Sequence, residues 1–161
     1  MIVLGIDPGL ATTGIGIVEK RGDDLRTLAW MTIETSKGSR SPRLAEVASD
    51  LRRIVKKFKP DLACVEQLYF QTNVKTAMEV SEARGVILFV LAEAVIAVLE
   101  PNPLEVKHAV TGDGHADKRQ VQDMLVRTLN LSEIPKPDDS ADALALAVYG
   151  AVQQRLSDLR Q

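Results

Sequence analysis

The sequence predicts an α/β domain built on a mixed five-stranded sheet that is flanked by helices. Five strand-like segments lie within the first hundred residues, and the first three of them follow one another directly. Helical patterns separate or follow the other two. No repeat, low-complexity segment or linker interrupts this order, so residues 1–161 are expected to form a single domain whose last few residues fray.

The first three strands are predicted over residues 2–6, 13–19 and 24–34 as an antiparallel meander. Residues 2–6 are apolar or small throughout, which is typical of a fully buried strand. Residues 13–19 alternate glycine with apolar residues, and residues 24–34 include Leu25, Leu28 and Trp30. A turn at Pro8-Gly9 follows Asp7 and leads into the second strand.

The remaining elements are delimited by prolines and capping residues. Ser41-Pro42 is expected to start a helix that ends before Pro60, because Ser is a good N-cap and Pro suits the first helical position. The other predicted elements are a strand over 62–68, a helix over 73–93, a strand over 95–99, a helical turn over 104–110, a helix over 117–130, and a final helix capped by Asp138 or Asp139.

Charge and composition narrow the function classes. The net charge of −2 argues against a protein that simply coats nucleic acid, although residues 37–59 contain eight basic and only two acidic residues. That basic segment either contacts outer parts of an anionic polymer or forms an ordinary solvated helix face. The single cysteine, Cys64, fits a reducing cytoplasm, and no signal peptide or membrane span is recognisable.

Four acidic residues are notable for their positions. Asp7 ends the first strand, Glu66 sits inside an apolar strand, and Asp139 and Asp142 share one face at the start of a helix. Each has a structural explanation when it is taken singly: a turn, an ion pair or a helix cap. Taken together, they predict convergence at one edge of the sheet. Because the ligands are oxygens without a Cys or His cluster, they indicate Mg²⁺ or Mn²⁺, and two such ions about 4 Å apart would suit in-line displacement at phosphorus.

Several ordered motifs carry a resemblance to a known family. They are GIDPGLATTGIGIVE (5–19), VEQLYF (65–70), SEARGV (81–86), the segment around Lys107, ADKRQVQ (116–122) and DDSADALALA (138–147). With these motifs the chain resembles the RuvC-type Holliday-junction resolvases along nearly its whole length. The resemblance implies a ribonuclease H-like fold with catalytic, metal-binding acids at Asp7, Glu66, Asp139 and Asp142. The family's final pair is spaced by three and followed by Ala-Leu-Ala, which selects Asp139 over Asp138.

The resemblance also implies residues that hold DNA. Lys107 and Lys118 match basic residues that the family places near the scissile phosphate, and Lys118 is also expected to take part in catalysis. Arg119, next to Lys118, is a weaker candidate for DNA binding. Tyr69 matches an aromatic residue that stacks on an unpaired base, with Phe70 beside it as a further DNA-binding candidate or a core residue. The glycines around Asp7 are interpreted as leaving room for a phosphate backbone.

The function implied is metal-dependent resolution of four-way DNA junctions by paired symmetric nicks that leave 5′-phosphates, in recombination and repair. A homodimer suits a two-fold substrate, and the face over residues 85–91 is the candidate interface. The resemblance further implies work with the RuvA–RuvB branch-migration complex. The alternatives are a ribonuclease H-like nuclease acting on other nucleic acids and a junction-binding module without catalysis. An actin-like ATPase would need two lobes, and this chain has one.

Overall fold

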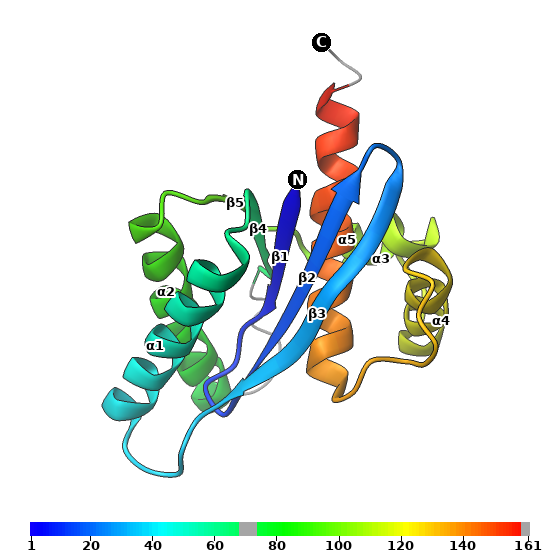
Figure 1. Ribbon diagram of the computed structural model, residues 1–161. Coiled ribbons are helices and arrows are strands. Elements are labelled where there is room, and N and C mark those ends of the chain that lie inside the picture. Colours follow the sequence, from blue (N-terminus) through cyan, green and yellow to red (C-terminus); the bar gives the residue numbers. More distant parts are fainter. Residues whose placement is uncertain (68–73, 159–161) are drawn as a thin grey trace.

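A mixed five-stranded sheet separates two helical layers (Figure 1). The computed structural model describes residues 1–67 and 74–158, so the predictions on Tyr69 and Phe70 lie outside the described residues. The strands are β1 (Ile2–Asp7), β2 (Thr12–Arg21), β3 (Asp24–Glu34), β4 (Leu62–Val65) and β5 (Ala97–Leu99), in the order β3-β2-β1-β4-β5. β1, β2 and β3 pair antiparallel, whereas β4 and β5 run parallel to β1, as predicted for a mixed sheet.

Helices cover both faces of the sheet. α1 (Arg40–Phe58) and α2 (Val74–Glu93) pack on one face, and α5 (Asp138–Asp158) lies along the other with α3 (Pro103–Thr111) and α4 (Lys118–Thr128) beside it (Figure 1). Each layer has its own hydrophobic core. None of the helices in the described part of the chain is long and apolar enough to cross a membrane.

The predicted elements all occur, but two boundaries differ in ways that affect the acids. β4 ends at Val65, so Glu66 follows the strand and is not inside it as predicted. The reason is that the amide of Gln67 donates to the carbonyl of Pro101 (2.9 Å), which draws the chain away from the β1 ladder. α5 begins at Asp138, so Asp138 and Asp139 both occupy its first turn and neither is the residue before it.

The strands β1 and β4 alternate between the two cores. Leu4 and Ile6 of β1 belong to the core beneath α1 and α2, whereas Val3 belongs to the core beneath α5. By the period of two along a strand, Asp7 therefore faces the α5 side. The same alternation in β4 places Leu62 and Cys64 on the α5 side, and Glu66 continues that series.

Glycines in β1 and β2 allow α5 to approach the sheet closely. A Cβ atom built on Gly16 would lie 2.6 Å from the Leu144 nitrogen of α5, and Cβ atoms on Gly5 and Gly14 would collide with the carbonyl oxygens of Ala143 and Asp139. The prediction that these glycines leave room for a phosphate backbone is thus wrong for these three positions. The backbone that occupies the space belongs to the protein's own helix.

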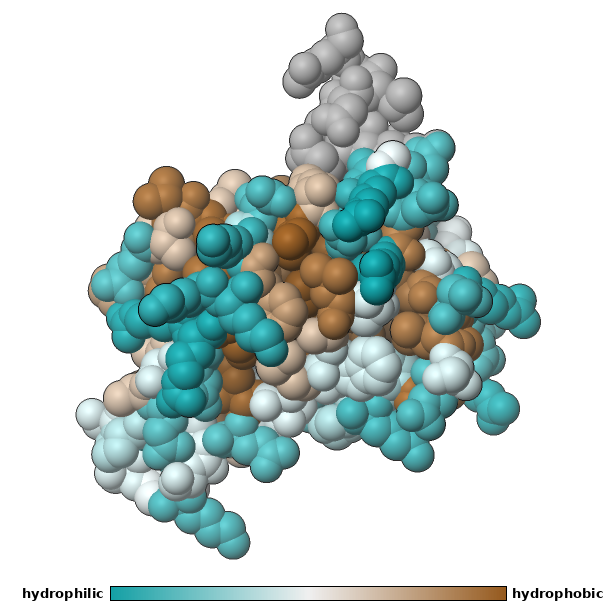
Figure 2. Space-filling model, viewed as in Figure 1, coloured by the Kyte–Doolittle hydropathy of each residue, from teal (hydrophilic) through white to brown (hydrophobic). Residues whose placement is uncertain are grey.

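The edge strand β3 carries apolar surface. Figure 2 shows polar side chains over α1 and over the β2–β3 hairpin, with more apolar surface between them along the sheet edge. Leu28 and Trp30 are the large apolar side chains of this strand that are exposed by about a third (36% and 37%). Isolated apolar residues of this kind are common on protein surfaces.

Replacing Gly16 with alanine tests the close packing of α5. The added methyl group meets backbone atoms that cannot rotate away, so Gly16→Ala is expected to lower the free energy of unfolding by about 3 kcal/mol or more. In a chain of this size that corresponds to a fall in Tm of roughly 6–12 °C, measurable by circular dichroism.

Gly22→Ala in the β2–β3 turn is the matched control. Gly22 has a φ of 59° and no atom within 4 Å of a built Cβ, so only backbone strain of about 1 kcal/mol is expected there. If Gly16→Ala costs no more than Gly22→Ala, α5 can move off the sheet easily and the packing argument fails.

Candidate active site

The acids predicted from the sequence come together at one end of the sheet. Ile6 of β1 pairs in register with Val65 of β4, so the next residues, Asp7 and Glu66, are neighbours on the α5 side. Asp7 also pairs with Gly14 of β2, and the backbone of Asp139 in the first turn of α5 lies directly over that glycine. Asp142 follows one turn later on the same helix face.

These carboxylates interact strongly with one another. Burial, followed by the charges of Glu66, Asp142 and Asp139, raises the pKa of Asp7 to about 8, and only Lys118 opposes this rise. Burial and then the charge of Asp142 raise the pKa of Glu66. Burial also raises the pKa of Asp142, against the lowering effect of Lys118. The site therefore concentrates negative charge that is not fully neutralised by the protein.

Lys118 forms ion pairs with two aspartates of α5. Its Nζ lies 3.0 Å from Asp138 Oδ2 and 3.4 Å from Asp142 Oδ2. Burial would lower the pKa of Lys118, but the hydrogen bond to Asp138 and the charge of Asp142 outweigh it and raise the pKa. A lysine at the first position of α4 opposes the helix dipole, and these two aspartates offset that cost.

Asp138 and Asp139 have different surroundings. Asp139 is partly buried, and its charge is felt by Asp7. The Asp138 side chain is 67% exposed and turns to Lys118 on the outer side of the site. These contacts favour Asp139 as the partner of Asp7 and give Asp138 a separate role in holding Lys118.

A cavity of about 210 Å³ opens beside the acids, and Glu66, Lys107, Lys118 and Asp142 line it. Lys107 comes from α3 and Lys118 from α4, so both predicted DNA-binding lysines reach the same hollow as two of the acids. Arg119 is exposed next to Lys118 on α4. The floor of the cavity is apolar and includes Val106, Val121 and Leu146.

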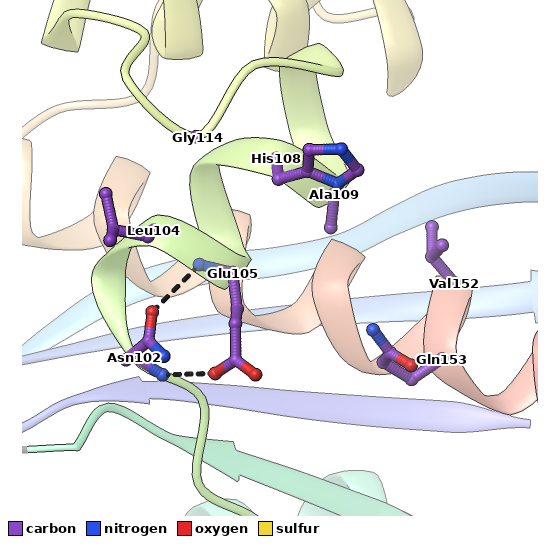
Figure 3. A pocket seen from close by; sticks show the side chains of 8 residues that line it. All are labelled: Asn102, Leu104, Glu105, His108, Ala109, Gly114, Val152 and Gln153. Atoms are coloured by element: carbon purple, nitrogen blue, oxygen red, sulfur yellow. Dashed lines mark hydrogen bonds between the residues drawn. The ribbon is translucent and has the colours of Figure 1, made fainter.

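A second hollow, of about 500 Å³, lies apart from these acids between α3 and α5 (Figure 3). At its edge Asn102 and Glu105 form the capping box of α3, with hydrogen bonds of 2.8 and 3.0 Å. These polar groups are already engaged with each other, and the hollow includes none of the predicted site residues.

The acids fit a divalent cation chemically, although the ligands are not pre-assembled. Within residues 1–67 and 74–158, no three carboxylate, histidine or cysteine side chains are close enough together to hold a metal ion as they stand. The donors are oxygens only, and a cation would offset the burial and the repulsion that together raise the pKa of Asp7. Binding would require the carboxylates to move towards one another.

Much of the basic segment is occupied with internal contacts. Its side-chain bonds include Arg40 to Glu82 (3.1 Å), Arg43 to Thr35 (2.9 Å), Arg52 to Glu93 (2.7 Å) and Arg53 to Asp50 (2.9 Å). Lys56 and Lys57 are exposed. These contacts connect α1 with α2 and with the end of β3. They favour a structural role for the basic residues of segment 37–59 over contact with DNA.

Sequence reasoning missed Arg84 of α2. It lies in the SEARGV motif, but no role was assigned to it. Its Nε donates to the backbone carbonyl of Glu66 (3.1 Å), and its guanidinium also pairs with Glu100. No residue pattern in the sequence indicates a backbone carbonyl as a partner, so only the fold could reveal this contact.

Comparison with known proteins identifies the family. The family model described as crossover junction endodeoxyribonuclease RuvC matches residues 3–150. The chain belongs to the RuvC family. RuvC of Halothermothrix orenii is 47% identical over 158 residues, covering 98% of this chain and 96% of that protein. RuvC of Chloroflexus aurantiacus is 51% identical over 152 residues, covering 94% and 93%.

Solved structures agree with this assignment. The T. thermophilus RuvC structure in complex with Holliday junction substrate has a TM-score of 0.92 at 33% identity, covering 98% of this chain and 96% of that one. The yeast mitochondrial resolvase Ydc2 has a TM-score of 0.72 at 17% identity, covering 98% and 81%, and shows the fold alone. The RuvC fold is ribonuclease H-like, as the sequence predicted.

This RuvC-family protein is a crossover junction endodeoxyribonuclease that resolves Holliday junctions. The family acts in DNA recombination and repair and consists of metal-dependent nucleases. Junction DNA is therefore the substrate that the acids and lysines of the site must accommodate.

The raised pKa of Asp7 predicts that the free energy of unfolding of the metal-free protein depends on pH. An unfolded aspartate loses its proton near pH 4, whereas folded Asp7 keeps it up to about pH 8. The native state thus binds more protons in this window, and its free energy of unfolding falls as pH rises. Asp7→Asn is expected to be more stable than the wild type by about 2–4 kcal/mol at pH 8.5 and nearly equal at pH 4.

Urea unfolding in the presence of a chelator measures this difference. Asp138→Asn is the control, since its exposed carboxylate should change stability by less than about 1 kcal/mol at either pH. Equal stability of Asp7→Asn and the wild type at pH 8.5 would contradict the electrostatic account of the site.

Proposed function

We propose that Asp7, Glu66, Asp139 and Asp142 form the centre that cleaves the junction and hold two Mg²⁺ ions, or Mn²⁺, per site. The observation that carries this is the position of Asp7, whose pKa is raised by burial and by the three other acids at the same edge of the sheet. Such crowding costs stability, and a protein retains it where the acids serve a function.

The ions, when bound, would supply charge stabilisation at the scissile phosphate and an activated water. The residues of the chain then have separable tasks. Asp7 and Glu66 extend from adjacent parallel strands, which gives them a rigid base. Asp139 and Asp142 extend from a helix locked against the same strands. This framework limits how far any of the four carboxylates can drift from the phosphate.

Lys118 is proposed to stabilise negative charge that develops on the phosphate. Its Nζ is already 3.4 Å from Asp142, at the mouth of the cavity that Glu66 also lines. Asp138 holds the ammonium group from the outer side, so the charge stays at the site before DNA arrives. Lys107, across the same cavity, is proposed to bind an adjacent phosphate.

Further DNA contacts are proposed for Arg119, Tyr69 and Phe70. Arg119 is exposed beside Lys118 and can reach a backbone phosphate. The two aromatic residues are proposed to stack on bases at the junction centre, which is supported by their place in the sequence, three and four residues after Glu66, and by the family resemblance.

A homodimer through α2 is proposed for symmetric cleavage. Met78, Gly85 and Phe89 share one face of α2, and Met78 and Phe89 are 53% and 58% exposed. Ile87 and Leu91, within the predicted range 85–91, are buried in the core of the same protomer and cannot contribute. The proposed interface therefore excludes the buried residues of the predicted range 85–91 and extends towards the N-terminal end of α2 as far as Met78.

We also propose that residues 1–161 act as one nuclease domain, in the cytoplasm, together with the RuvA–RuvB branch-migration complex. A single continuous sheet with two packed layers supports the domain proposal. The proposals on the partnership and the location rest on family membership.

Removing any of the four acids is expected to abolish paired nicking. Asp7→Asn, Glu66→Gln, Asp139→Asn and Asp142→Asn should each slow cleavage of a synthetic four-way junction in Mg²⁺ at least about a hundredfold, because a metal ligand is lost. Binding of the junction, measured by fluorescence anisotropy without divalent ions, should remain. Asp138→Asn is the matched control and should stay within about fivefold of the wild type.

An inactive Asp138→Asn beside an active Asp139→Asn would show that the ligand assignment in α5 is wrong. Equal cleavage of a simple duplex and a four-way junction would contradict junction specificity.

A charge in the α2 face is expected to separate the protomers. Phe89→Glu should sediment as a monomer at micromolar concentration and lose paired nicks, because burying an unpaired carboxylate in an interface is costly. Leu104→Glu is the control, since Leu104 of α3 is equally exposed (53%) but lies outside α2. A Phe89→Glu protein that remains dimeric would place the interface elsewhere.

A further inference from the structure

Arg84 links three segments that meet at the proposed active site. It lies on α2, its side chain is only 17% exposed, and its Nε donates to the carbonyl oxygen of Glu66 (3.1 Å). The guanidinium also pairs with the carboxylate of Glu100, directly after β5. A planar guanidinium with several fixed donors is suited to join two acceptors in this way.

In the described part of the chain, the backbone of Glu66 and Gln67 makes few other hydrogen bonds. The Glu66 amide donates to the Ile6 carbonyl at 3.3 Å, which is the last contact with β1. The Gln67 amide then donates to Pro101 (2.9 Å), next to the Glu100 that holds Arg84. Among the described residues, the backbone of Glu66 and Gln67 is therefore held by one long hydrogen bond, one bond to residue 101, and Arg84.

We propose that Arg84 is a positioning residue for junction cleavage: it fixes the Glu66 backbone so that the carboxylate is presented to the cations and the scissile phosphate. This inference rests on the proposed role of Glu66. Arg84 bonds the carbonyl and not the carboxylate, so it acts through the direction of the side chain. Supporting groups of this kind hold a reacting group within a fraction of an ångström, and their loss weakens metal binding or activity.

The position of Arg84 gives it a second connection. Gly85, the next residue, lies on the face proposed to contact the second protomer. If α2 packs against the second protomer, that contact would also fix the position of the Arg84 guanidinium, which donates to the Glu66 carbonyl. The active site and the proposed interface are joined by one side chain.

Arg84→Gln is the variant that tests the proposal. Single-turnover cleavage of a four-way junction with saturating protein should fall about 10–100-fold at low Mg²⁺, and the Mg²⁺ concentration for half-maximal rate should rise about tenfold. High Mg²⁺ should recover much of the rate. Protection of the Gln67 amide against hydrogen exchange should also fall about tenfold, because the segment after β4 is loosened.

Two variants control for effects on stability alone. Arg40→Gln breaks a different arginine–glutamate pair that involves α2, between Arg40 and Glu82 (3.1 Å), without touching Glu66, and should leave the Mg²⁺ requirement and Gln67 protection unchanged. Glu100→Gln keeps the hydrogen bond from Arg84 to Glu66 and should slow cleavage by less than about threefold. Junction affinity and dimer mass should match the wild type in all three variants.

The outcomes separate this proposal from the one on which it rests. If Glu66→Gln is inactive but Arg84→Gln has the wild-type rate, Mg²⁺ requirement and amide protection, the positioning role is wrong. If Arg84→Gln only lowers Tm, to the same extent as Arg40→Gln, the contact is structural and the proposal is again overturned. If Glu66→Gln itself cleaves normally, Glu66 is not a metal ligand, and both the proposed function of Glu66 and the positioning role of Arg84 are wrong.

Discussion

The close approach of α5 to the sheet is the constraint on which the rest of the structure depends. At Gly5, Gly14 and Gly16 no side chain separates the strand from α5, so helix backbone rests directly on strand backbone at these three positions. This contact sets the height of the first turn of α5 and brings Asp139 over the strand pair that carries Asp7. A larger residue at any of these positions would lift the helix and separate the two halves of the site.

That packing creates electrostatic repulsion between the acids, on which the proposed active site is based. Four carboxylates meet where burial weakens their hydration, and the pKa of Asp7 rises accordingly. Lys118 relieves only part of the repulsion, through Asp142 and Asp138. The remaining charge suits divalent cations and, through them, a phosphodiester. Stability is reduced locally so that the site favours ions and DNA when they arrive.

Several particular residues show how far the sequence alone could predict this arrangement. The order of the elements, the meander and the mixed sheet were correct because proline and periodicity signals are local. The end of β4 was not, since the Gln67 amide bonds Pro101, thirty-four residues further along the chain. The glycines around Asp7 were misinterpreted for the same reason: what fills the space beside them comes from α5, more than a hundred residues away.

By itself, the sequence determined the family and the fold class and nominated the candidate acids, because residue types at fixed spacing can be recognised without knowledge of the fold. Only the tertiary structure decided how these residues are arranged. Strand alternation placed Asp7 and Glu66 on the α5 side, helix contact distinguished Asp139 from Asp138, and Arg84 was joined to a backbone carbonyl. The physical reason is that side-chain direction and main-chain partners follow from register and packing between distant segments, which leave no mark in local sequence.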